Sequence, residues 1–473
     1  MERGGRINLG KNEINYEIYA NGENIKVYQD ETRSYDIKNF DGEIYKTVTD
    51  RPAYAIISNE FPISFEIVSK KVFDKIKMRP ISANIVPNIS EGIIKFVVDT
   101  PQKLSLEFDD DLSEPLLLFI NKTCINVPDL EAEGIHFFKG GKSYDIGCLE
   151  LKSNETLYIE KGAVVYGTIK INQAENVRIC GGGVLDGTKL HRNETRQVNR
   201  LILANSCKNL TIEGITLFDG PTWHLVVVNS NFVKIDNVNI ISLVPSGDGI
   251  DLVGSSNVEI SRCLFKTNDD CVAVKCFPKG ENEYTIIKDI VVHDCVCWSA
   301  THGNVLEIGY ELCTDEVKNI TFRDCDIIHC EHEGYQSGGV FTIHNGDHAC
   351  VNNILYENIR VEDANEKLID IKVLNAVYST DKIRGKVQNI RFKNIQVVDG
   401  TLPPSIIRGY ESEESVFRVE VSKDKIMYVI RDLRGQGCVE DIVIDGLYVH
   451  GNKIENLQQG KIVVEISTNV RFE

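Results

Sequence analysis

An eight-residue pattern recurs through most of the chain and sets the strongest limit on its fold. The order is apolar, polar, apolar, two polar or Gly, apolar, any residue, apolar. It occupies residues 210–217, 233–240, 258–265, 290–297, 320–327, 354–361, 390–397 and 442–449. The starting positions differ by 23, 25, 32, 30, 34, 36 and 52 residues. A period near the low twenties that is lengthened by loop insertions is typical of a solenoid.

The two-residue alternation inside the pattern predicts strands that point one set of side chains inward, and the paired polar positions predict a bend. No stretch has the periodicity of a helix. We therefore expect a right-handed parallel β-helix over residues 123–473, in which each coil hydrogen-bonds to the next. Asn often precedes the pattern, as at Asn209, Asn257, Asn319, Asn353 and Asn389. The same apolar position in successive coils is Cys263, Cys295 and Cys325, which predicts a stack of thiols in the core.

Residues 1–122 do not contain this eight-residue pattern. Short apolar runs such as 54–57, 63–67 and 93–98 are separated by turn residues at intervals typical of a sandwich. We predict an N-terminal antiparallel β-sandwich domain, so the fold class is all-β with two domains. This domain has no catalytic cluster. It either covers one end of the β-helix or binds carbohydrate.

The charge and the cysteines limit partners and location. A formal net charge of −18 disfavours nucleic acid and anionic membranes, and no stretch has 18 uninterrupted apolar residues. There are 14 cysteines, none in a CxxC pair. Together with the lack of an apolar leader, they favour free thiols in the cytoplasm, although a secreted location stays open if a leader has been removed. The oligomeric state is not indicated.

Acidic residues gather where the predicted coils turn. Asp248 and Asp251 stand at the start of one strand, and Asp269 and Asp270 precede the equivalent strand one coil later. Neighbouring coils are about 4.8 Å apart, so equivalent turn positions stack into a column. The next two coils contribute His302 and His344. The sequence therefore predicts a strip of Asp, Asp, His and His along one face.

Carboxylates this close cannot all ionise freely, so the pKa of at least one is raised, and an acid then stands beside a base. Glycosidic cleavage by inversion needs such a pair, with a separation of roughly 6.5–9.5 Å that leaves room for a water. Carboxylates one coil apart are expected in or near that range. The strip is therefore a candidate site for glycoside hydrolysis.

Other side chains near the strip are candidates for substrate binding. They are Asp251, Trp223, His224, Lys275, Glu307, Tyr310 and His344. Trp223 suits stacking on a sugar ring, or it simply packs in the fold. Asp370 extends the strip by one more coil. No cofactor or metal is expected, because no set of ligands has suitable spacing.

Three motifs together resemble glycoside hydrolase family 28, the polygalacturonase-like family. They are residues 247–251 (GDGID), 268–271 (NDDC) and 302–303 (HG), and residues 221–224 (PTWH) also look like that family. The resemblance covers about residues 150–345. It implies an inverting, metal-free glycosidase that cleaves α-glycosidic bonds of an oligo- or polysaccharide. It also implies that Asp269 is the general acid, that Asp248 and Asp270 activate the water, and that His302 tunes the acid.

The departures from that family concern the substrate. Its polygalacturonases present an Arg-x-Lys pair that holds the substrate carboxylate, whereas the matching strand here reads Thr342, Ile343 and His344. Residues 101–119 and 304–310 look like glycoside hydrolase family 49, the dextranase and isopullulanase family. That family joins a β-sandwich to the same β-helix, lacks the pair and cuts neutral glucans. We therefore expect a substrate that need not be charged, with Lys275 as a partial substitute for the missing cations.

Two other functions remain open from the sequence. A polysaccharide lyase would use Ca²⁺ held by the acids and a Lys or Arg base. A non-catalytic β-helix that binds sugars would keep the aromatic residues without needing adjacent acids.

Overall fold

The structure is a computed structural model that describes residues 14–38, 44–123, 127–191, 200–278, 286–331, 338–410, 421–422, 425–426 and 437–473. The chain divides into two compact units, residues 1–126 and 127–473. Each unit is described by itself below. Residues 1–13 of the predicted sandwich lie outside the described part.

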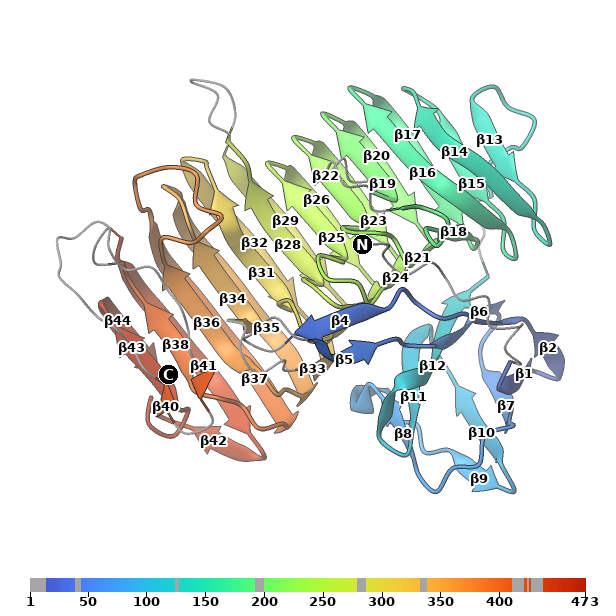
Figure 1. Cartoon of the computed structure of the whole chain (residues 1–473), viewed down its shortest axis with the longest axis horizontal. Helices are drawn as coiled ribbons and strands as arrows, with labels where there is room; N and C mark the ends of the chain where they lie inside the picture. The colour runs from blue at the N-terminus through green and yellow to red at the C-terminus, as the bar shows by residue number, and fades with distance from the viewer. Residues whose placement is uncertain are drawn as a thin grey trace. The chain divides into compact units, whose positions relative to one another are not determined.

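The first unit is built on two five-stranded sheets (Figure 1). One has the order β2 (Glu23–Ile25), β1 (Tyr16–Ala20), β7 (Ile63–Ser69), β10 (Ile93–Val98) and β9 (Asn88–Ser90). The other has the order β3 (Val27–Gln29), β6 (Ala53–Asn59), β12 (Asp111–Lys122), β11 (Gln102–Phe108) and β8 (Ile76–Arg79). A separate antiparallel pair joins β4 (Tyr35–Lys38) to β5 (Ile44–Val48).

Alternate residues of both sheets share one hydrophobic core, which includes Ile18, Phe65, Phe96, Leu106 and Leu118. The predicted antiparallel β-sandwich is confirmed with one exception, because β6 and β12 pair in parallel. The long connection between them, which passes through both sheets, allows the two strands to run in the same direction.

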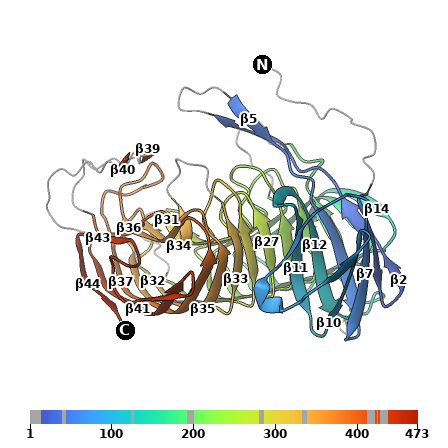
Figure 2. The same cartoon turned by 90° about the horizontal axis from the view of Figure 1, so that it is seen from below.

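The second unit is a parallel β-helix with three strands in most coils (Figures 1 and 2). It begins with β13 (Ile135–Phe138), β14 (Ser143–Leu151), β15 (Thr156–Ile159) and β16 (Val164–Asn172). From there each strand pairs in parallel with its equivalent in the next coil, which forms three faces. We call them the first, second and third face.

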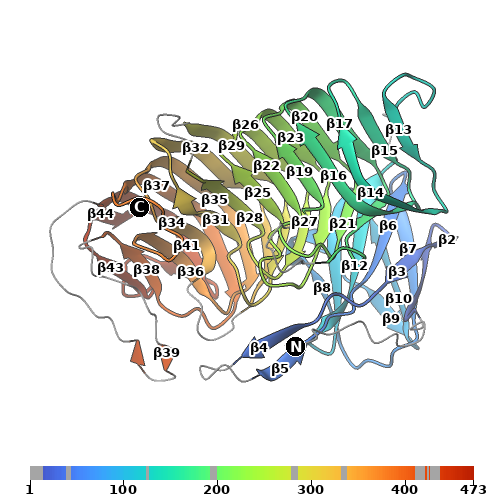
Figure 3. The ribbon, with the colours of Figure 1, turned by 45° about the horizontal axis from the view of Figure 1, so that its top comes forward.

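The first face consists of β17 (Glu175–Gly181), β20 (Lys208–Glu213), β23 (Asn231–Asp236), β26 (Ser256–Ser261), β29 (Ile287–His293), β32 (Glu316–Arg323), the first halves of β35 (Cys350–Asp363), β37 (Lys386–Asp399) and β41 (Val439–Val449), and β44 (Ser467–Phe472). The second face consists of β18 (Val184–Asp186), β21 (Thr216–Phe218), β24 (Asn239–Ile241), β27 (Leu264–Thr267), β30 (Val296–Ser299), β33 (Asp326–Cys330) and the second halves of β35, β37 and β41. Strands of the first face lie side by side in Figure 3.

The third face consists of the second half of β16, β19 (Ile202–Asn205), β22 (Leu225–Val228), β25 (Ile250–Val253), β28 (Val272–Cys276), β31 (Leu306–Leu312), β34 (Gly339–Asn345), β36 (Lys367–Val373), β38 (Ser405–Arg408) and β43 (Ile462–Glu465). The eight-residue pattern covers the first two strands of a coil. The third strand lies between two copies of the pattern, which explains why the repeat length varies with the loops around it.

The interior of the β-helix is a continuous apolar core that is formed by the inward positions of all three faces. The predicted thiol stack lies within it. Cys263, Cys295 and Cys325 are buried, and each Sγ lies 3.2–3.3 Å from the carbonyl oxygen two residues before it. No helix within the described ranges is long and apolar enough to cross a membrane.

Candidate active site

The predicted acidic strip lies at the turns that lead into β25, β28 and β31 of the third face. The parallel backbone ladder continues through these turns. Gly249 N–H donates to the carbonyl of Asp270 (2.8 Å), and Cys271 N–H donates to that of Asn304 (3.0 Å). Equivalent turn residues of three coils are therefore stacked, which is the arrangement that the sequence predicted.

The stacking brings three carboxylates together. Oxygens of Asp248, Asp269 and Asp270 lie within 4.8 Å of one another. Asp248 and Asp270 are buried, and Asp269 is partly exposed. The expected separation of roughly 6.5–9.5 Å is therefore wrong for the nearest oxygens. Asp269 and Asp270 are neighbours in one turn, and Asp248 stacks directly on that turn.

Lys275 of β28 lies at the centre of the acids. Its ammonium is 2.8 Å from Asp248 Oδ2, 3.0 Å from Asp251 Oδ1 and 3.5 Å from Asp270 Oδ2. The side chain is 6 % exposed. Lys275 therefore neutralises the acids and is not available as the cation that grips a substrate, although the sequence suggested this role.

Backbone and amide donors fix the other oxygens. Ser246 N–H donates to Asp269 Oδ2 (2.9 Å). The backbone N–H and the side-chain amide of Asn304 donate to Asp270 Oδ1 (2.9 and 3.0 Å). Asp248 Oδ1 is buried and accepts no hydrogen bond from the described residues.

The three acids share a raised affinity for protons. Burial raises the pKa of Asp248 to about 7, with Asp251 adding to the shift and Lys275 opposing it. Burial likewise raises the pKa of Asp270 to about 7, although the charge of Lys275 lowers it. For Asp269, burial and then the charges of Asp248 and Asp270 raise the pKa well above its ordinary value. Such a group retains a proton beside carboxylates that have lost theirs.

His302 precedes β31. Its Nδ1 lies 3.4 Å from Asn268 Oδ1 and 3.2 Å from the hydroxyl of Thr301. Burial lowers the pKa of His302 to about 4, so the ring is neutral at pH 7. The next residue, Gly303, packs on the backbone of the acids, because a Cβ there would lie 2.2 Å from the carbonyl carbon of Asp269.

Further along the third face, His344 is enclosed by acids. Its Nδ1 lies 3.1 Å from both oxygens of Glu307, and its Nε2 lies 3.4 Å from Asp370 Oδ2. Lys372 in turn lies 2.8 Å from Asp370 Oδ1. Although burial opposes the charge, Glu307 and Asp370 raise the pKa of His344 to about 9. The imidazolium is 0 % exposed and its ring stacks on Tyr310 at 4.4 Å.

The other predicted substrate contacts divide into exposed and buried groups. Trp223 is partly exposed, with Lys275 and Arg200 over its ring at 4.2 and 4.3 Å. His224 is 0 % exposed, and its Nε2 accepts from Gly220 N–H while its Nδ1 donates to the carbonyl of Asp248. His224 thus supports the turn of Asp248. Asp251 and Glu307 are also 0 % exposed and contact the cations beneath the surface.

The sequence singled out Trp223 and Tyr310 but not the two aromatic residues that pack against them, Phe277 and Tyr378. Tyr378 is 55 % exposed, lies 5.5 Å from Tyr310 and is close enough to Asp269 and Asp270 for their charges to raise its pKa, after burial. Phe277 stacks on Trp223 at 6.1 Å. Both follow third-face strands, so a search for aromatic residues just after those strands would have found them.

Two groups of side chains are close enough together to hold a metal ion: the acids Asp248, Asp269 and Asp270, and a separate group of Cys313, Asp347 and Asp381. The separate group is engaged within the protein. Asp347 Oδ1 accepts from the backbone of Thr380 and Asp381, and its Oδ2 accepts from Leu312 N–H. Asp381 accepts from His348. These bonds connect a loop to the coil, so we interpret this group as structural.

Stacked turns of this parallel β-helix hold three carboxylates together, which is the arrangement that the sequence predicted for a glycosidase, and Lys275 pairs with two of them. Residues 131–418 match the family model described as Glycosyl hydrolases family 28. The chain belongs to that family, as its motifs predicted.

Individual relatives are distant. A polygalacturonase of Juniperus ashei is 25% identical over 245 residues, which are 47% of this chain and 45% of the relative. A probable polygalacturonase of Arabidopsis thaliana is 28% identical over 167 residues, 35% of this chain and 33% of the relative. The chain thus spans about half or less of the length of these relatives.

The solved structure Dex49A from Penicillium minioluteum is 13% identical and covers 97% of this chain and 94% of its own, with a TM-score of 0.63. At this identity the likeness concerns the fold alone. It extends over both units, in agreement with the family-49 features that the sequence suggested.

Proposed function

We propose that the protein hydrolyses an α-glycosidic bond of an oligo- or polysaccharide with Asp269 as the general acid. The observation that supports this role is the cluster of three carboxylates in which Asp269 is the partly exposed member with the strongly raised pKa. A protonated carboxyl that reaches the surface is the group that can protonate a leaving oxygen.

Asp248 and Asp270 are the proposed bases for the attacking water. Lys275 favours their ionised forms, and Asp248 Oδ1 is oriented by no donor among the described residues. Inversion at the anomeric carbon is proposed because a water held by two carboxylates attacks directly. Because the carboxylates are closer than is usual for inverting enzymes, the stereochemistry is best measured by NMR of the first product.

The substrate class follows from the cations on the third face. A uronate is normally held by an exposed guanidinium or ammonium. Lys275, His344 and Lys372 are each at most 6 % exposed and lie against carboxylates. These positions therefore do not offer a uronate clamp, and we propose that the sugar at this part of the site is neutral. Pectic chains with neutral residues and α-glucans both meet this requirement.

A lyase is less well supported than a hydrolase. Its base would be a lysine or arginine with a lowered pKa. The acids Asp248, Asp251 and Asp270 instead raise the pKa of Lys275 well above its ordinary value, although burial opposes them. An ammonium held in this way does not accept a proton from substrate.

The decisive experiment compares Asp269→Asn and Asp270→Asn with the wild type on pectic, α-glucan and α-galactoside oligosaccharides. We expect reducing ends from the wild type and at least a 10³-fold loss in both variants, with unchanged circular dichroism. Asp294→Asn, an exposed acid of another turn, is the matched control. Full activity in both active-site variants would refute the mechanism.

We further propose a cytoplasmic location. The cysteines in the described part of the chain are all free, and most are buried in the β-helix. Many unpaired thiols suit a reducing compartment. Fractionation of the native cells tests this proposal, and recovery of the protein from the medium would contradict it.

A further inference from the structure

One column of residues runs along the start of the first-face strands, and all but its first member lie within those strands. Its members occupy equivalent positions in successive coils, beside residues that pair in register, and adopt a left-handed backbone conformation, with φ between 54° and 66°. They are Asn154, Asn176, Asn209, Phe232, Asn257, Asp289, Asn319, Asn353, Asn389, Asp441 and Asn469. Each is Asn or Asp except Phe232.

The amides of this column donate from one coil to the one before. Asn209 Nδ2 donates to Asn176 Oδ1 (3.0 Å), and farther along Asn353 Nδ2 donates to Asn319 Oδ1 (2.8 Å). Phe232 has no polar group to continue the series. Asn257, in the next coil, donates instead to Asn231, the residue before Phe232. Phe232 therefore contributes no side-chain hydrogen bond to this ladder, which makes the same one-residue shift farther along, where Asn389 donates to Asn352.

Phe232 is unfavourable at this position in two ways. Its φ is 58°, in a region that Asn tolerates and that is a clear outlier for a bulky side chain. Its ring is 55 % exposed, so it does not contribute the burial that usually justifies an aromatic residue. The fold imposes this conformation on every member of the column, so Phe232 is the one member whose side chain is unsuited to it, and residues held in unfavourable backbone conformations cluster at binding sites.

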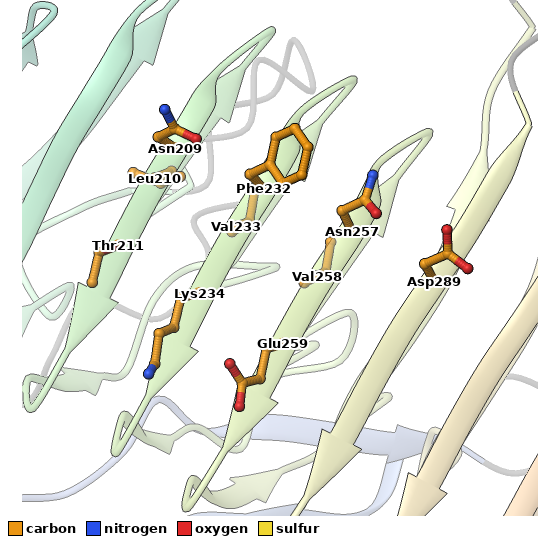
Figure 4. Close-up of a pocket in the computed structure, with 10 residues that line it drawn as sticks. All are labelled: Asn209, Leu210, Thr211, Phe232, Val233, Lys234, Asn257, Val258, Glu259 and Asp289. Carbon is orange, nitrogen blue, oxygen red and sulfur yellow. The ribbon is translucent and has the colours of Figure 1, made fainter.

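The ring lies in a shallow hollow of about 420 Å³ on the first face (Figure 4). Asn209 and Asn257 flank Phe232 on the neighbouring strands, with Asp289 one strand farther on. Lys234 and Glu259 lie farther along β23 and β26. The apolar residues beneath, Leu210, Val233 and Val258, are at most 3 % exposed. The hollow thus presents one aromatic ring surrounded by amides and a few charges.

We propose that this hollow is a second carbohydrate-binding site, which holds a neutral sugar unit of a polysaccharide on the ring of Phe232. A pyranose has an apolar face that stacks on an aromatic ring and hydroxyls that bond to amides and carboxylates. The lining is close to neutral, with one Lys against one Glu and one Asp, which suits an uncharged ligand. The choice of carbohydrate rests on the proposed function.

The site is separate from the acids. The acids lie at the turns that lead into third-face strands, whereas Phe232 follows β22, at the opposite end of such a strand. A long chain bound at Phe232 is held on the enzyme without entering the reaction. A protein partner is a poorer match, because protein interfaces have a core of several apolar side chains and this hollow exposes one.

The test compares the wild type with Phe232→Asn, which restores the residue type of the column. Affinity electrophoresis in gels that contain dextran, pullulan, arabinan or galactan measures the retardation of each protein. We expect at least one polysaccharide to retard the wild type and the dissociation constant to rise about tenfold in Phe232→Asn. Phe232→Trp should retain binding. Tyr448→Asn, which removes an exposed aromatic residue of β41, should not affect it.

Activity separates this proposal from the proposed function. Phe232→Asn should cleave short oligosaccharides at the wild-type rate and long polymers more slowly at low concentration. The same retardation in Phe232→Asn as in the wild type, or no retardation of the wild type by any neutral polysaccharide, would overturn the second site. A wild type that binds polymers through Phe232 but releases no reducing ends would overturn the proposed hydrolysis alone.

Discussion

The ammonium of Lys275 lies 2.8 Å from Oδ2 of Asp248, one coil away, and the same group contacts Asp251 and Asp270. Three acids and one lysine thus form a buried cluster in which the charge of Lys275 decides how many carboxyls ionise. The activity of the site should therefore depend on pH, and substitution of Lys275 should change that dependence.

Lys275→Met removes the cation that opposes the raised pKa values of Asp248 and Asp270. Both carboxyls then bind protons more tightly, so the acidic limb of the pH profile of kcat/KM should move to higher pH. Activity at pH 6 should fall at least tenfold. Profiles of both proteins on one oligosaccharide measure this shift, with the exposed Lys288→Met as control. An unchanged acidic limb would show that Lys275 has no influence on the bases.

The wild-type profile should itself be bell-shaped. The bases need Asp248 and Asp270 ionised, so kcat/KM should fall as the pH drops through about 7. The acid needs Asp269 protonated, and its strongly raised pKa places the loss of activity on the alkaline side. The two limbs belong to the coupled acids together. Activity that rises steadily toward pH 4 would contradict this assignment.

The sequence predicted this cluster because its acids stand at turns, and turns of a parallel β-helix stack wherever the strands between them stay in register. That rule alone is enough to predict that Asp248 and Asp269 lie close together. The ion pairs of Lys275 with these acids were not predictable from that rule. Lys275 pairs in register with Val253 and reaches the acids only through its long side chain. The sequence placed Asp370 one coil beyond His344, but it did not predict that His344 is held between Glu307 and Asp370, because a pattern of strands does not show which side chains form ion pairs.

Phe232 shows a different limit. Asn209 and Asn257 were recognised as part of a recurring Asn just before the eight-residue pattern, and Phe232 occupies the same place in the coil between them. The exception was present in the sequence. It became informative only with the backbone angle and the exposure of the ring, because a Phe near the start of a strand is common.

His344→Phe should destabilise the β-helix. The substitution removes the cation between the buried carboxylates of Glu307 and Asp370. Removal of one partner of a buried ion pair lowers the free energy of unfolding by about 3–5 kcal/mol. The pKa of His344 is raised to about 9, so its stabilisation is complete below about pH 6.5 and is lost as the pH rises through 9. Denaturant midpoints at pH 6, 7.5 and 9 should converge with those of the wild type at high pH. The exposed His450→Gln provides the control, and an equal midpoint for His344→Phe at pH 6 would refute the ion-pair network.

Gly303→Ala tests whether the position of the acids depends on the close approach of the next coil. An added Cβ would lie 2.2 Å from the carbonyl carbon of Asp269 and 2.4 Å from the backbone nitrogen of Asp270, so the turn that holds both acids has to move. A displacement near 1 Å in a catalytic group costs about 10²-fold in rate, and we expect a loss of that size in kcat with little change in KM. Gly182→Ala is matched to it, because the atom nearest to an added Cβ there is the Cβ of Lys161, at 3.2 Å instead of 2.2 Å. Equal activity in Gly303→Ala and Gly182→Ala would mean that the acids tolerate movement of their turn, and the geometric basis of the mechanism would have to be abandoned.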